Sequence, residues 1–240
     1  MTTNNIYLLL AGQLTLYDRV AIEANNMANA SALGFQERYL LIQKKNQSVK
    51  PMEKLTFPDD VSSPRSARPG PLSPTYQALD VAINGAGFFK IQTPLGIRYT
   101  RAGNFRNNLG TLSTQDGYPV LDASDSTIAL PAEMNALGID GAGTITNGVD
   151  VLTTLGIVDF AKESDLESVG GGLLKANADP IEASGYTILQ GMLEQGNVQT
   201  VLKMEDIMQL QRNFNGLTET VIAHYKLLET TLTTLAKVKA

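Results

Sequence analysis

Both ends of the chain carry long stretches in which apolar residues recur in alternating steps of three and four. In the N-terminal stretch this row consists of Ile6, Leu10, Gln13, Tyr17, Val20, Ala24 and Met27. In the C-terminal stretch it consists of Ile207, Leu210, Phe214, Leu217, Val221, His224, Leu228, Thr231, Leu235 and Val238. Such spacing is typical of helices that pack along a seam. The pattern predicts one long helix within residues 1–36 and another within 197–240, with Asn197 as the N-cap of the second.

Between the two ends the pattern changes to that of short strands and turns. Residues 37–77 are rich in proline, which predicts an extended connector without regular structure. Residues 78–165 alternate short β-like runs with turns such as Asn84–Gly87 and Asp116–Gly117. Residues 166–196 are predicted as a return segment. The expected fold is therefore α+β, in which the terminal helices pair as a coiled-coil core domain and an all-β domain is inserted between them.

Composition and motifs exclude several classes of function. The chain has no cysteine and a single histidine, His224, which excludes thiolate chemistry, histidine-based triads and multi-histidine metal cages. The formal net charge of −5 argues against a nucleic-acid surface. Gly85 and Gly87 lack the third glycine of a dinucleotide loop, so a hairpin turn is predicted there. We therefore expect no catalytic residue, cofactor, metal or small-molecule substrate.

The sequence also bears on membranes and export. No apolar run approaches the roughly 20 residues of a membrane span, so direct membrane insertion is not expected. The short apolar run at residues 6–11 follows no basic segment, which makes it a poor secretory signal. We expect a chain without a cleaved signal peptide.

The composition of the two helical stretches is unusual for surface helices. Residues 1–36 contain only three charged side chains, Asp18, Arg19 and Glu23, whereas a surface helix normally has a charged face. A helix buried in one globular core is the alternative, but helices of about 45 Å exceed what a small strand domain covers. Threonines weaken the second helix. We infer that the ends are loose alone and become ordered on association.

Three motifs stand in order along the chain. They are ANNMANASALGF at residues 24–35, ALDVAINGAGFFKIQT with YTRAGNFRNNLGTLSTQDGYPVL at 78–93 and 99–121, and GNVQTVLKMEDIMQLQRNF at 196–214. Together they resemble the signature motifs of the flagellar basal-body rod and hook protein family. The chain length and the short connector resemble the proximal-rod members of that family most.

The resemblance implies a structural subunit of the bacterial flagellar rod, located in the basal body where the rod crosses the periplasm. It implies type III export, self-assembly through the terminal helices and torque transmission without catalysis. Its partners would be other rod proteins or copies of itself. The alternatives are a distal-rod, hook or hook-associated axial protein of the same family and, more distantly, a carbohydrate-active enzyme with convergent carboxylates on a β scaffold.

We expect the subunit interface to use the two apolar rows and the amides at the end of the first helix. Gly34 is predicted as the left-handed stop of that helix, and the nearby asparagines are predicted to hydrogen-bond to neighbouring subunits. The predicted interface residues are Ile6, Leu10, Tyr17, Val20, Asn25, Asn26, Met27, Asn29, Ile207, Leu210, Phe214, Leu217, Val221, Leu228 and Leu235.

Overall fold

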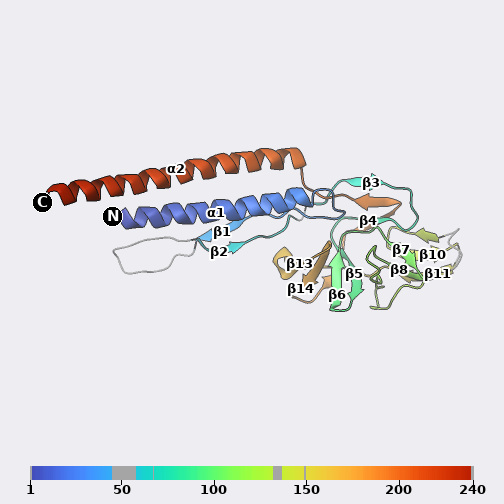
Figure 1. Ribbon diagram of the computed structural model, residues 1–240. Helices are drawn as coiled ribbons and strands as arrows, with labels where there is room; N and C mark the ends of the chain where they lie inside the picture. Colours follow the sequence, from blue (N-terminus) through green and yellow to red (C-terminus); the bar gives the residue numbers. More distant parts are fainter. Residues whose placement is uncertain (1, 45–57, 67, 132–136, 149, 239–240) are drawn as a thin grey trace. The chain divides into compact units, whose positions relative to one another are not determined.

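The computed structural model describes residues 2–44, 58–66, 68–131, 137–148 and 150–238 (Figure 1). Along the sequence, helix α1 (Thr2–Ala28) precedes a region of short strands and helix α2 (Thr200–Val238) follows it. The chain divides into two compact units built from alternating segments. The helical unit comprises residues 1–28, 38–64 and 199–240, and the β unit comprises 29–37 and 65–198. The predicted α+β class is confirmed.

In the helical unit, α1 and α2 lie side by side and run in opposite directions (Figure 1). Gln13 Nε2 donates a hydrogen bond to Thr218 Oγ1 at 3.1 Å. Ten residues later on α1, Glu23 pairs with Lys203 near the start of α2. Strands β1 (Leu41–Lys44) and β2 (Pro58–Ser62) form an antiparallel pair in the same unit. The structure does not by itself establish a coiled coil.

The least exposed positions of α2 follow the row predicted from the sequence. Leu210 is 4% exposed, the lowest value in that row. The half-buried members of the row are Ile207, Leu217, Val221, His224 and Leu228, and Phe214 is 36% exposed. The side chain of Leu235 lies outside the described residues. The predicted row is therefore the inner face of α2 within the chain.

The inner face of α1 differs from the predicted row by one position. Leu10, Tyr17 and Met27 were expected on the packed seam but are 40%, 67% and 38% exposed. Gln13 and Val20 of the predicted row are among the less exposed positions, together with Leu9, Gly12, Leu16, Glu23 and Asn26, which the predicted row did not contain. The predicted row is wrong at Leu10, Tyr17 and Met27 because two adjacent rows of α1 are both largely apolar, so spacing alone does not distinguish them. The side chain of Ile6 lies outside the described residues.

The first helix also ends earlier than predicted. α1 stops at Ala28, and residues 29–34 form turns in the β unit, with Ala32 N–H donating to Asn29 O at 2.9 Å. Gly34 does adopt the left-handed conformation, with φ of +63°, but it is not the residue that ends the helix. Asn197 is likewise not the N-cap of α2, because its side chain bonds to Glu37 and Arg68 instead.

The β unit is built from several small antiparallel sheets. Its largest sheet has the strand order β13-β14-β6-β5-β12-β15, a second has the order β11-β10-β9, and β16–β4, β17–β3 and β7–β8 form pairs. The bounds are β3 Leu72–Pro74, β4 Val81–Asn84, β5 Phe88–Thr93, β6 Gly96–Thr100, β7 Arg106–Asn108, β8 Thr111–Ser113, β9 Leu137–Ile139, β10 Thr144–Asn147, β11 Asp150–Thr154, β12 Ile157–Asp159, β13 Leu166–Gly170, β14 Leu173–Ala176, β15 Ile181–Glu182, β16 Thr187–Gln190 and β17 Met192–Glu194, with a 3₁₀ turn at Glu163–Asp165.

These pairings correct three predictions. The segment 37–77 is not without regular structure, because it contains β1, β2 and β3, with Pro58 and Pro74 at strand ends where proline is tolerated. The sheets do not stop at residue 165, because β14 to β17 each pair with a strand that precedes that residue, and β13 pairs with β14. The glycine-rich turn after β4 does not close a hairpin, because β4 pairs with β16 while β5 pairs with β6. The tight turn at Asp116–Gly117 is confirmed, with Gly117 at φ of +87°.

The hydrophobic core of the β unit forms where these sheets pack together. Fully buried residues such as Ile83, Phe89 and Ile91 lie at its centre, and the rings of Phe89 and Phe105 pack edge to face at 5.1 Å. A smaller cluster gathers Phe88, Tyr99 and Phe160. Apolar burial of this kind is the main stabilising contribution to the unit.

Candidate subunit interface

An exposed apolar row runs along α1 next to the inner face. Its members recur in steps of four and three, and every one is exposed and uncharged. We call the α1 outer row Leu10, Leu14, Tyr17, Ala21, Ala24 and Ala28. Leu14 and Tyr17 are each about two-thirds exposed. A helix that is apolar on two adjacent faces is suited to a second packing partner.

Helix α2 carries a comparable row one position away from its inner face. Its exposed apolar members share one heptad frame, in which Gln211, Asn215 and Thr218 occupy the middle and Glu229 lies between the last two apolar members. We call the α2 outer row Val201, Met204, Met208, Ile222, Tyr225 and Leu232. Methionine and tyrosine are common at protein contacts because they offer adaptable apolar area. Each terminal helix therefore has an inner face used within the chain and an outer row that is exposed.

A buried polar cluster interrupts the apolar inner face of the helical unit. Glu23 Oε2 accepts from Lys203 Nζ at 3.1 Å, and both side chains are little exposed, at 9% and 14%. The fully buried Asn26 donates from Nδ2 to Glu23 Oε2 at 3.3 Å and to Arg38 O at 2.7 Å. Its Oδ1 accepts from Arg38 N–H at 2.9 Å. The amide of Asn26 thus pairs with the backbone of Arg38 as a neighbouring strand would.

This cluster changes the role predicted for the asparagines. Asn26 was expected to bond to neighbouring subunits, but its amide is engaged inside the chain. Asn25 is exposed and Asn29 is half-buried. Sequence reasoning missed Lys203 as the partner of Glu23. No local signal joins residues so far apart, although a lone acidic residue in an uncharged helix suggests a basic partner.

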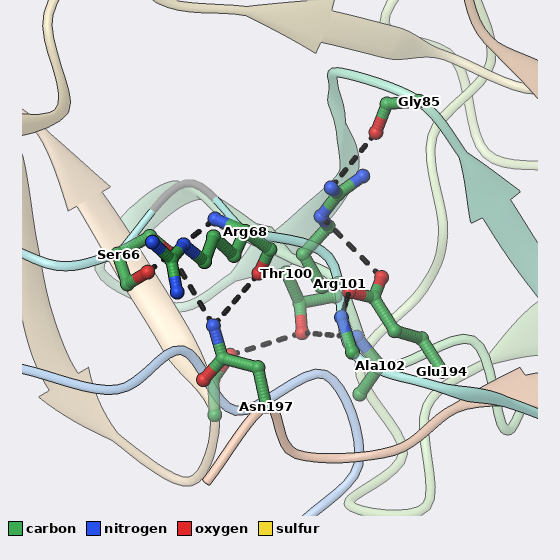
Figure 2. Close-up of polar contacts among 10 residues, drawn as sticks. Ser66, Arg68, Gly85, Thr100, Arg101, Ala102, Glu194 and Asn197 are labelled. Carbon is green, nitrogen blue, oxygen red and sulfur yellow. Dashed lines mark hydrogen bonds and ion pairs between the residues drawn. The ribbon is translucent and has the colours of Figure 1, made fainter.

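The β unit has its own buried polar cluster, which Figure 2 shows. The Arg101 guanidinium donates to Gly85 O at 2.8 Å, and its Nε lies 3.5 Å from Glu194 Oε2. Glu194 Oε1 accepts from Gly70 N–H at 2.9 Å. Beside this pair, Asn197 Nδ2 donates to Arg68 O at 2.7 Å. These contacts hold together segments that are distant in the sequence.

Burial is the largest cause of the pKa shifts of Glu194 and Arg101. Burial raises the pKa of Glu194, while Arg101 and the Gly70 amide oppose that rise. Burial likewise lowers the pKa of Arg101, against the opposing effect of Glu194. Both carboxylate and guanidinium are almost completely enclosed, so no substrate reaches them. The arrangement is typical of a structural ion pair.

A surface hollow of about 480 Å³ lies elsewhere on the β unit. Its lining includes Leu95, Arg98, Tyr118 and Val169, with Asp116 as its carboxylate. The enzyme alternative requires two convergent carboxylates, and this hollow does not supply a pair. Within the described ranges, no group of three or more metal-binding side chains comes together. None of the described helices is sufficiently long and apolar to span a membrane.

Comparison with known proteins gives these features a family context. Residues 82–147 match the family described as flagellar hook protein FlgE/F/G D1 domain. The chain is 33% identical over 222 residues to the flagellar basal-body rod protein FlgF of Caulobacter vibrioides, covering 89% of this chain and 90% of the relative. It is 31% identical over 217 residues to FlgF of Rhizobium meliloti, with the same coverage.

A relative with a different name aligns over a shorter part. The chain is 32% identical over 170 residues to the flagellar basal-body rod protein FlgG of Bacillus subtilis, covering 65% of this chain and 64% of that relative. The chain therefore belongs to the flagellar basal-body rod protein family and resembles its FlgF members.

Proposed function

We propose that this chain is a structural subunit of the flagellar basal-body rod, which assembles through the outer rows of α1 and α2 and transmits torque. The observation that carries the proposal is the pair of exposed, heptad-spaced apolar rows on helices that are already packed on another face. An exposed apolar row is costly in water and favours association that removes it from solvent.

The partners in this proposal are other rod proteins and further copies of the chain. The names of the relatives support a location in the basal body. The fuller coverage of the alignments to FlgF, 89% of this chain against 65% and 80% for FlgG relatives, supports the proposal of a place in the proximal rod. We further propose that the subunit acts in the periplasmic part of the rod, that it is exported without a cleaved signal peptide, and that its role is mechanical rather than catalytic.

The test places a charge in each outer row. Leu14→Asp and Ile222→Asp replace exposed apolar side chains, so the free chain should fold normally while assembly is lost. Rod formation is measured by complementation of motility in a strain lacking the gene and by recovery of the subunit in isolated basal bodies. We expect at least a tenfold loss of the incorporated subunit.

Asn213→Asp is the matched control, because it adds the same charge to an exposed position of α2 outside the outer row. It should leave incorporation unchanged. Wild-type incorporation of both outer-row variants would show that these rows are not interfaces. Unchanged circular dichroism and melting of the free variants are needed to attribute any loss to assembly.

A further inference from the structure

We propose that the buried polar cluster of Glu23, Asn26, Arg38 and Lys203 determines the register in which α1 and α2 pack, and that these are specificity-determining residues of the helical unit. The consequence for assembly rests on the proposed function, because the register decides how the two outer rows are presented together. The register itself is a property of the single chain and is tested without assembly.

The geometry joins three segments of the helical unit at one place. Glu23 and Asn26 come from α1, Lys203 comes from α2, and Arg38 precedes β1. Asn26 is fully buried, and its amide is engaged through both its oxygen and its nitrogen. Asp206 lies 3.7 Å from Lys203 but is half exposed, so it stands at the edge of the cluster. The charged groups of Glu23 and Lys203 are thus paired and little exposed, while Asp206 beside them is half exposed.

Apart from the hydrogen bond between Gln13 and Thr218, which both cysteine pairs below remove at Gln13, the rest of the inner face does not specify one register. Its side chains are mostly apolar and repeat in steps of three and four, so a shift of α2 by one heptad, about 10 Å, matches apolar to apolar again. After that shift Glu23 faces the position of Leu210, the most buried side chain of the row. The carboxylate is then buried without its ammonium partner, which is strongly unfavourable. A polar residue in an apolar seam sets register in this way in other helical pairs.

The experiment uses the absence of cysteine from the chain. One pair of cysteines replaces Gln13 and Thr218, which are hydrogen-bonded in the observed register. A second pair replaces Gln13 and Tyr225, which face each other only after a shift of one heptad. A thiol cross-linker shorter than that shift is applied to the dilute, unassembled chain, and the linked fraction is measured. With the cluster intact we expect linking of 13 to 218 and background linking of 13 to 225.

The decisive variant is Glu23→Leu with Lys203→Leu, which removes the charge pair and leaves apolar side chains. We expect the yield of the 13–225 link to rise at least fivefold while helical circular dichroism is retained. Asp206→Asn is the matched control, and should leave both yields unchanged. A 13–225 yield that stays at background in the folded double variant would overturn the proposal, because apolar packing alone would then set the register.

Single substitutions at Lys203 decide the question if the double variant does not fold. Lys203→Arg keeps the charge and should link 13 to 218 at the native yield. Lys203→Met leaves Glu23 buried without that charge and should reduce the yield several-fold. Native, exclusive 13–218 linking in Lys203→Met would contradict the proposal. An outer-row variant that assembles normally would instead count against the proposed function and leave the register result standing.

Discussion

At the scale of single residues, Gly34 has the left-handed conformation that the sequence predicts, but it does not end helix α1. The sequence predicts a left-handed glycine there, and φ is +63°. The reason lies in the β unit, since a Cβ at Gly34 would stand 2.6 Å from the backbone carbon of Arg101. Its own N–H donates to Glu194 O at 2.8 Å. The residue is glycine because two backbone segments approach closely at this point.

Gly34→Ala should therefore destabilise the β unit by about 2–4 kcal/mol, from left-handed strain and overpacking together. Gly216 provides the matched control. It lies within α2 with no neighbour within 4 Å of an added Cβ, so Gly216→Ala should stabilise the helix by about 0.5–1 kcal/mol. Urea unfolding followed by circular dichroism measures both. Equal effects of the two substitutions would refute the close-approach argument.

At the scale of elements, the turn between β9 and β10 depends on one carboxylate. Asp140 Oδ1 accepts from Thr144 N–H at 2.8 Å and from Ala142 N–H at 2.9 Å. The hydrogen bond from Thr144 is the largest cause that lowers the pKa of Asp140 below its ordinary value. The ionised carboxylate is thus the form that this turn favours.

The lowered pKa gives a pH-dependent contribution with a definite sign. The contribution of Asp140 is present above the unfolded pKa of about 3.9 and is lost as pH falls through the lower folded value. Asp140→Asn should therefore lower the melting temperature at pH 7, and the difference from the native chain should shrink to nothing in acid. Asp179→Asn, at another exposed position, serves as the control. A difference that persists unchanged at pH 2 would contradict this explanation.

At the scale of the whole molecule, the chain forms each compact unit from segments that alternate along the sequence. The helical unit uses both termini, so it is completed only when the last residues are available. The β unit is formed by residues 29–37 and 65–198 and has a large core of buried side chains. The two units differ in how much apolar surface they bury, because most side chains of α2 are exposed.

This difference predicts unequal local stability in the unassembled chain. Amide exchange should be fast over α1 and α2 and slow over core strands such as β4 and β5, since exchange follows the free energy of local opening. Hydrogen–deuterium exchange with mass spectrometry measures this. Ordering of the helices on assembly then predicts their protection in isolated rods. Strong protection of both helices in the dilute chain would contradict the idea that they become ordered on association.

Sequence alone predicted the α+β class, the tight turn at Asp116–Gly117 and the family, and the α2 row that it assigned to a subunit interface contains the least exposed positions of that helix. These depend on local periodicity, turn chemistry and motif order, which are present in the residues themselves. It misplaced the end of α1, the inner row of α1 and the role of Asn26.

The tertiary structure decided between alternatives that were locally equivalent. Leu9 and Leu10 fit a heptad row equally well, and in the folded chain Leu9 shares the less exposed face with Glu23, which pairs with Lys203. Nothing in the sequence around Asn26 indicates that its amide bonds to the backbone of Arg38, and the folded chain brings the two together. Likewise, β4 and β5 are adjacent in sequence but pair with β16 and β6. The physical reason is the same in each case: a buried charge or amide requires a partner, and a strand requires a neighbour, and local sequence pattern does not determine which part of the chain supplies them.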